Sequence, residues 1–131
     1  VQILKGQEFV PINGVNLVVS REELVELQKK TNSLSVHDSI FDYIVTLIEK
    51  TRNSEYFTLG ASPRGANSLL RMSRAMALLS GRNYVVPDDI EAVFTAVLGH
   101  RVKLSSRARA NGFTVDTALE EVRKSVKLPR T

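Results

Sequence analysis

The sequence predicts an all-α fold: a small helical bundle of about five helices with at most a minor short two-stranded element. Apolar residues recur at helical spacing in several separate segments. Serine, threonine or proline stands at the start of most of these segments, as is typical of helix N-termini. The chain has 43% hydrophobic residues but only 6% aromatic residues and no Trp, so its core must be mostly aliphatic, which suits packed helices.

The first helix is predicted over residues 21–32. Ser20 and Glu23 have the spacing of a capping box, in which each side chain accepts the backbone N–H of the other residue. The apolar side of this helix is expected to consist of Val19, Leu24 and Leu27. The preceding residues, 1–19, contain turn signals and predict an extended lead-in with a short strand at Asn16–Val19.

Two longer helices are predicted next. Ser35 precedes a helix over 36–52, with an apolar stripe of Val36, Ile40, Ile44, Leu47 and Ile48. Residues 53–61 are mostly polar and predict a loop. Ser62 then caps a helix over 63–80, and Pro63 takes the first helical position, where its missing N–H costs nothing. The inward face of this helix is expected to consist of Ala66, Leu69, Leu70, Ser73, Met76 and Ala77.

A fourth helix is predicted to begin at Pro87 and to end at Gly99. Asp88 and Asp89 lie in its first turn, where acidic side chains suit the helix dipole. Its buried face is expected to consist of Ile90, Val93, Phe94 and Val97.

The remaining residues predict a strand, a loop and a last helix. Polar and apolar residues alternate over Arg101–Leu104, which predicts a short strand paired with Asn16–Val19. Residues 105–113 predict a polar loop. Thr114 caps a helix over 115–127, and Pro129 prevents its continuation.

Composition excludes several kinds of chemistry. The chain has 131 residues, which predicts one domain, and it has no cysteine, so disulfides and thiolate chemistry are impossible. Its histidines, His37 and His100, are isolated and predict no metal site. The chain contains no phosphate-binding loop and no supported Ser/His/Asp set. Since it also lacks a membrane-spanning run and a signal-peptide pattern, we expect a cytoplasmic protein.

The paired acids do not predict general acid or base catalysis. Asp88 and Asp89 stand where a helix start favours carboxylates, and Glu120 can pair with Lys124 one turn later. Both pairs are therefore interpreted as structural.

Arg64 is the residue that helix chemistry does not explain. A helix N-terminus already carries partial positive charge, so a cation in the first turn has the wrong sign. Arg71 and Arg74 extend a basic side along the same predicted helix. Two partners for Arg64 stay open on these grounds: a phosphate held with the free N–H groups of the helix, or an acid of the preceding loop such as Glu55.

Residues 59–102 closely resemble the C-terminal lid of MoxR-family AAA+ ATPases. Three segments carry the resemblance: Gly-Ala-Ser-Pro-Arg at 60–64, Gly-Arg-Asn-Tyr-Val-Val-Pro-Asp-Asp at 81–89, and Leu-Gly-His-Arg-Val at 98–102. Further agreement extends the resemblance from about residue 16 to the end of the chain. Two residues depart from the family pattern: Val86 stands where a hydroxyl cap is common, and Gly99 where a bulkier residue is frequent.

The resemblance implies a function. It makes Arg64 the sensor 2 arginine, a catalytic residue that contacts the terminal phosphate of ATP, within a nucleotide-binding segment of Ala61, Ser62, Pro63 and Arg64. Residues 1–15 would be a linker from an upstream ATPase core, and 16–131 the helical lid domain. The core would supply the phosphate loop and hold Mg²⁺, so the chain alone is not expected to hydrolyse ATP or to bind it tightly.

Members of this family assemble as homo-oligomeric rings, commonly hexamers, and act as chaperone-like ATPases in the maturation of protein complexes. The resemblance therefore implies three kinds of partner: the upstream core, neighbouring subunits and a client complex. It leaves the identity of the client open, and also whether Arg64 serves the nucleotide of its own subunit or of a neighbour.

Two other classes compete with the ATPase lid. The net charge of +4 and the basic helix would suit a nucleic-acid-binding module, although the basic residues are dispersed along the chain. A protein-interaction scaffold without a nucleotide role is the other alternative. Among AAA+ relatives, the lids of magnesium-chelatase-type ATPases are the most easily confused with this pattern.

Overall fold

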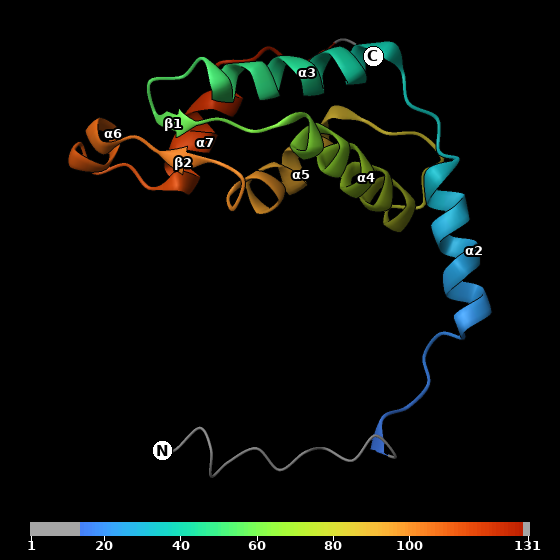
Figure 1. The fold of residues 1–131 in the computed structure, drawn as a ribbon. Coiled ribbons are helices and arrows are strands. Elements are labelled where there is room, and N and C mark those ends of the chain that lie inside the picture. Colours follow the sequence, from blue (N-terminus) through green and yellow to red (C-terminus); the bar gives the residue numbers. More distant parts are fainter. Residues whose placement is uncertain (1–13, 130–131) are drawn as a thin grey trace, which may run out of the picture.

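The structure, a computed structural model, describes residues 14–129, and within that range the chain forms six helices and one two-stranded sheet. In chain order the elements are α2 (Arg21–Asn32), α3 (Asp38–Arg52), β1 (Phe57–Leu59), α4 (Pro63–Leu79), α5 (Pro87–Leu98), β2 (Lys103–Leu104), α6 (Ser106–Ala110) and α7 (Val115–Lys124). Figure 1 shows that α3 to α7 form one body, from which α2 extends away. The predicted all-α fold with a minor two-stranded element is confirmed.

The core lies between α3, α4, α5 and α7, which pack directly against one another. It is aliphatic, as the composition predicts, apart from a few aromatic rings. Its fully buried large apolar side chains are Ile40, Leu47, Leu69, Ile90, Phe94, Leu98 and Leu119. The predicted inward stripes of the helices after Ser35 therefore supply most of the core.

The predicted pairing of the strand at Arg101–Leu104 is wrong. Only Lys103 and Leu104 of that segment form a strand, β2, and it pairs antiparallel with β1. β1 lies in the segment 53–61, which we expected to be a loop. Phe57 of β1 and Leu104 of β2 face each other and are both buried, so this pairing is favoured by burial of apolar area. Residues 16–19, by contrast, are exposed and form no strand.

Two helix boundaries and one additional helix differ from the prediction. α3 begins at Asp38 instead of residue 36, because the His37 ring accepts the Ser39 N–H and acts as the cap. A short helix, α6, occupies part of the predicted loop 105–113 and is capped by Ser105. α7 ends at Lys124, three residues before the predicted end.

The predicted apolar side of the first helix is not buried. α2 has the expected bounds, and its capping box is present, with the Ser20 N–H and a Glu23 carboxylate oxygen 2.7 Å apart. However, no residue of α2 is buried, and Leu24 and Leu27 are 51% and 45% exposed. α2 therefore forms over the predicted residues, but no other segment in the described part of the chain buries its apolar side.

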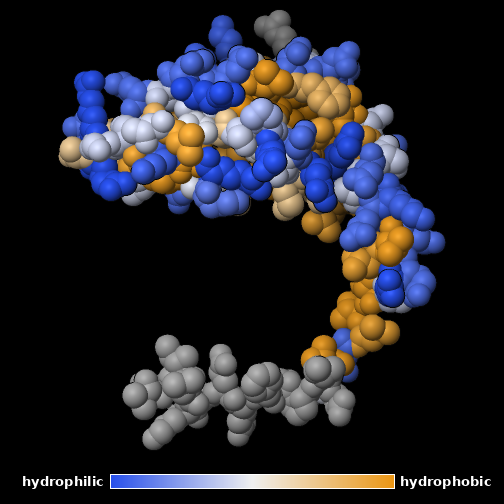
Figure 2. All heavy atoms as spheres, in the orientation of Figure 1, coloured by the Kyte–Doolittle hydropathy of each residue, from blue (hydrophilic) through white to orange (hydrophobic). Residues whose placement is uncertain are grey.

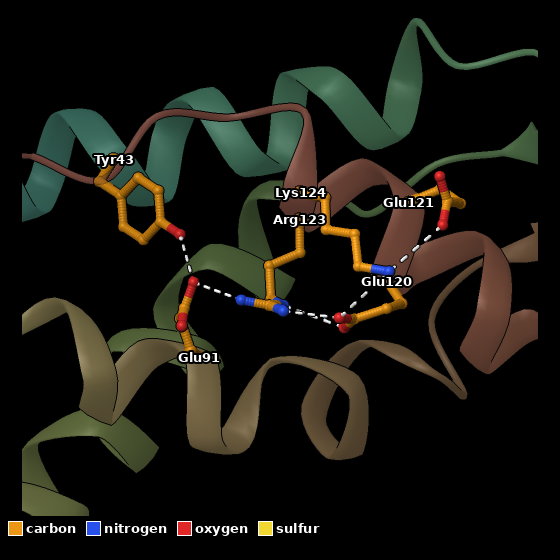
Figure 3. Close-up of polar contacts among 6 residues, drawn as sticks. All are labelled: Tyr43, Glu91, Glu120, Glu121, Arg123 and Lys124. Atoms are coloured by element: carbon orange, nitrogen blue, oxygen red, sulfur yellow. Dashed lines mark hydrogen bonds and ion pairs between the residues drawn. The ribbon is translucent and has the colours of Figure 1, made fainter.

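A polar network ties α3, α5 and α7 together at one side of the core (Figure 3). Arg123 of α7 forms ion pairs with Glu91 of α5 and Glu120 of its own helix, and the Tyr43 hydroxyl donates to Glu91 at 3.4 Å. Burial raises the pKa of Tyr43 to about 12, and the Glu91 charge adds to the shift. Lys124, the predicted partner of Glu120, is 3.9 Å from it and contributes a weaker pair.

We predict that Arg123→Ala lowers the free energy of unfolding by about 1–2 kcal/mol, because it removes charged hydrogen bonds and leaves the partly buried Glu91 carboxylate without its cation. Lys124→Ala is the matched control on the same helix and should change it by less than about 0.5 kcal/mol. Urea unfolding of the three chains checks this. Equal losses for the two variants would contradict a role for Arg123 in joining the helices.

Candidate functional site

The candidate site is the first turn of α4. Ser62 is the N-cap, Pro63 and Arg64 are the first two helical residues, and the first turn contains no acidic side chain. The Ser62 carbonyl accepts the Gly65 N–H at 2.8 Å, so the turn begins where the sequence predicts. The Ser62 hydroxyl, however, makes no capping hydrogen bond, which corrects the predicted side-chain cap.

The segment that leads into this turn is held against the end of α3. The Ala61 N–H donates to the Thr51 hydroxyl at 2.9 Å, and that hydroxyl donates to the Ile48 carbonyl at 2.7 Å. Thr51 is fully buried, so these bonds lie away from water. A Cβ on Gly60 would lie 2.5 Å from the Arg52 Cα, so only glycine allows this approach. The backbone before Arg64 therefore has a defined position.

Close packing of α4 on the end of α5 holds the other side of the turn. Gly65 is buried, and a Cβ there would lie 3.2 Å from a methyl carbon of Leu98. α5 is itself anchored at its start by Asp89, which accepts two hydrogen bonds from the Arg82 guanidinium, at 2.8 and 2.6 Å, and one from the Val86 N–H. Asp89 thus supplies the half of a capping box in which the N3 carboxylate accepts the N–H of the N-cap residue, although the Val86 side chain has no acceptor for the other half, and these contacts support the structural interpretation of Asp89.

The Arg64 side chain is exposed, and it has no ion-pair partner within residues 14–129. Glu55, the acid that the sequence left open as its partner, instead faces Arg107 at 3.6 Å. The local alternative for Arg64 is therefore not realised in this structure.

The predicted basic side of α4 is only partly a solvent-facing surface. Arg71 is exposed but lines a groove between α2, α4 and α5. Arg74 is half-buried, and its Nε has no hydrogen-bond partner in the described part of the chain. The three arginines of α4 therefore have three different environments.

The groove was not predicted from the sequence. It has a volume of about 740 Å³, a mainly apolar floor and a basic rim. Its lining residues are Gln28, Thr31 and Asn32 of α2, Ser68, Arg71, Met72 and Ala75 of α4, Val93, Ala96 and Val97 of α5, and His100 and Arg101. The spacing of residues 68, 71, 72 and 75 shows that they share one face of α4. The spacing does not show that this face lies across the groove from α2, which is seen only in the folded structure.

Two findings concern other kinds of site. Within residues 14–129, no group of three or more His, Asp or Glu side chains is arranged to hold a metal ion. The helices of the same range include none that is long and apolar enough to cross a membrane.

Comparisons with known proteins agree with this geometry. Residues 49–122 match the model of a family described as the AAA lid domain, and this match contains α4, α5 and the candidate site. The chain is 36% identical to the uncharacterized protein YeaC of Bacillus subtilis over 91% of its own length and 37% of the relative. It is 31% identical to "Chaperone MoxR1" of Mycobacterium tuberculosis, over 86% of this chain and 32% of that one.

Two further matches extend the comparison. "Protein MoxR" of Paracoccus denitrificans is 50% identical over 76% of this chain and 31% of its own length. A crystal structure of a Cytophaga hutchinsonii protein assigned as an ATPase superimposes with a TM-score of 0.81 at 28% identity, covering 98% of this chain and 41% of that one.

The chain spans about a third of the length of the curated relatives that it matches. The family match covers more than half of the chain, and the described helices have the arrangement of a small helical lid. The chain therefore belongs to the AAA lid domain family, as a C-terminal lid of the kind found in MoxR-family AAA+ ATPases.

Proposed function

We propose that the chain is the lid of an ATP-hydrolysing protein and that Arg64 is its sensor 2 arginine, which contacts the terminal phosphate of ATP. One observation carries the proposal: an exposed arginine without an ion-pair partner among residues 14–129 stands on a rigidly held helix start. A cation in this position works against the helix dipole, so it is better explained by an anion from outside the lid than by local stability.

The residues of the turn suit a phosphate. A guanidinium offers a planar pair of donors that matches phosphate oxygens, and the start of a helix adds partial positive charge. We place Ala61, Ser62, Pro63 and Arg64 in the nucleotide-binding segment. Ala61 fixes the backbone through Thr51, and the Ser62 hydroxyl is not used as a cap. The absence of an acid from the first turn leaves the charge of Arg64 available.

Bound ATP with Mg²⁺ would supply the phosphoryl group that is transferred to water. In this proposal, an ATPase core joined to the lid through residues 1–15 binds most of the nucleotide and the metal ion. The role of the lid is to hold a positive charge at the position where negative charge develops during hydrolysis. The linker itself lies mostly outside the described residues.

We further propose that the whole protein forms a homo-oligomeric ring, as the family resemblance implies, and couples hydrolysis to chaperone-like maturation of protein complexes. The name of the Mycobacterium tuberculosis relative, "Chaperone MoxR1", supports this role. In such a ring, the core of the same chain and the neighbouring subunits would be the partners of the lid.

We predict that Arg64→Ala lowers ATP turnover of the full-length protein by on the order of a thousandfold, because related arginine contacts accelerate transfer of the phosphoryl group by that order. The melting temperature of the 131-residue chain should change by no more than about 1–2 °C, since the side chain is exposed. Steady-state ATPase assays and thermal melts of the same substitution check both parts.

Arg109→Ala is the matched control, because Arg109 is also an exposed arginine but lies on α6, away from the turn. It should leave turnover unchanged. If Arg64→Ala instead lowers the melting temperature by many degrees while turnover per folded molecule is unchanged, Arg64 is a structural residue and the proposed role is wrong.

We also predict that Thr51→Val destabilises the chain by about 1–3 kcal/mol. Valine has nearly the shape of threonine, but it leaves the buried Ala61 N–H without an acceptor. Thr46→Val is the control on the same helix, because the Thr46 hydroxyl donates only to the Asp42 carbonyl of α3 itself. Chemical denaturation should show a clearly larger loss for Thr51→Val, and comparable losses would refute the anchoring role of this hydroxyl.

A further inference from the structure

The segment Leu-Gly-His-Arg-Val at 98–102 has no role in the proposed function, although it is one of the three segments that carry the family resemblance. In the structure it begins at the last residue of α5 and lies against the first turn of α4. A Cβ placed on Gly65 would be 3.2 Å from a methyl carbon of Leu98 and 3.7 Å from the Cδ of Arg101. The Arg101 side chain therefore lies directly beside the residue that follows Arg64.

The position of Arg101 is fixed by a backbone hydrogen bond and by packing. Its N–H donates to the Leu98 carbonyl at 2.8 Å in the turn that follows α5. Ala61 of the nucleotide-binding segment meets the same place on Gly65, since its Cβ would be 3.5 Å from a Cβ there. The absence of a side chain at position 65 thus keeps the space beside the turn open for the stem of Arg101.

The guanidinium of Arg101 is not used within the described fold. The residue is half-buried and makes no ion pair within residues 14–129. Its Nε is buried and has no hydrogen-bond partner there, a property that it shares, among the described residues, with Arg74 alone. Buried polar groups are normally hydrogen-bonded, so Arg101 requires an acceptor from outside the described chain.

Arg101 and Arg64 border one face of α4. Residues 64, 68 and 71 are four and three positions apart, so they share that face of the helix. Ser68 and Arg71 line the groove together with Arg101. The basic end of the groove therefore continues along this face toward Arg64, and a single anion at the first turn is within the range of both guanidinium groups.

The groove also borders the element that would connect the lid to the proposed core. Residues 1–15 lead into α2, and the second half of α2 lines the groove. Figure 2 shows apolar surface at the start of α2, where Leu24 and Leu27 are half-exposed. Apolar surface of this kind is expected where another domain packs. We therefore expect the core, and the ATP that it holds, on the side of the lid where the groove lies.

We propose that Arg101 is a second phosphate-binding arginine of the nucleotide site. The proposal rests on the proposed function, because it requires that ATP be bound at the first turn of α4. Arg64 holds the polyphosphate from the start of α4, and Arg101 holds it from the end of α5. The Nε–H of a guanidinium and one terminal N–H lie side by side, so they match two oxygens of one phosphate.

Charge favours a polyphosphate over a carboxylate of the core as the partner of Arg101. Two arginines beside one helix turn repel each other, and the partial positive charge of the helix start adds to this repulsion. A polyphosphate carries several negative charges and offsets both cations, whereas one carboxylate offsets only one of them.

The test measures how tightly the full-length protein binds an ATP analogue with a non-hydrolysable β–γ bond in the presence of Mg²⁺. Arg101→Met removes the guanidinium but keeps an unbranched stem beside Gly65. We expect binding to weaken by about tenfold to a hundredfold, because a charged hydrogen-bonded contact is lost. The melting temperatures of the nucleotide-free protein and of the 131-residue chain should fall by no more than about 1–2 °C, since the guanidinium has no partner there.

Arg74→Met is the matched control. Arg74 also has a buried Nε without a partner in the described part of the chain, but it lies about 15 Å beyond Arg64 along the axis of α4. Its substitution should change the affinity for the analogue by no more than about twofold. If Arg101→Met perturbs folding in a thermal melt, Arg101→Gln replaces it.

Three results would overturn the proposal. The first is an unchanged affinity of the folded Arg101→Met protein for the analogue. The second is a weaker affinity together with a melting temperature of the nucleotide-free full-length protein that is many degrees lower, which would assign the guanidinium to a carboxylate of the core. The third is an equal loss of affinity in the Arg74→Met protein.

The Arg64→Ala assay separates this proposal from the proposed function. If Arg64→Ala lowers turnover while Arg101→Met leaves binding unchanged, the sensor 2 assignment stands and the second phosphate contact is wrong. If Arg101→Met weakens binding while Arg64→Ala leaves turnover unchanged, ATP is bound at this turn but Arg64 is not its sensor. If neither substitution has an effect, the nucleotide is not bound at this turn and both proposals are wrong.

Discussion

The buried hydroxyl of Thr51 is the contact on which the candidate site depends. It joins the end of α3 to the backbone of Ala61, three residues before Arg64, and the glycine at position 60 permits the two segments to approach. Because a buried N–H without an acceptor is costly, this contact fixes the path of the chain where it enters α4. The orientation of the α4 start, and with it the direction available to Arg64, follows from this one junction and from the packing of Gly65 on α5.

Five arginines of the described range differ in their partners. Arg82 and Arg123 are held by carboxylates that cap or connect helices, so their charges are used within the fold. No ion pair in the described range involves Arg64, Arg71 or Arg101, and these three border the first turn of α4 or the groove beside it. The charges of these three arginines are thus not used within the described fold, although Arg21, Arg52, Arg74 and Arg109 also make no ion pair there.

α2 illustrates the difference between forming a helix and burying one. Its capping box and its dipole-matched charges, acidic at the start and basic at the end, stabilise the helix locally. Its apolar side chains nevertheless remain exposed, since the body is already closed by α3, α4, α5 and α7. An amphipathic helix of this kind is stable in isolation only to a limited extent, so its exposed face calls for a contact between chains or domains.

The elements whose signals are local could be predicted from the amino acids alone. The caps at Ser20 and Thr114, the prolines at 63 and 87, and the stripes that became the core act within a few residues, so their patterns predict the structure. The motif at 60–64 likewise located the candidate site, and its first turn was correctly placed. Local signals did not predict four features: the pairing of β1 with β2, the exposure of α2, the groove and the Thr51 anchor. These features depend on contacts between segments that belong to different elements. Such contacts are selected largely by the burial of apolar area in the whole fold, which a pattern within one segment does not specify.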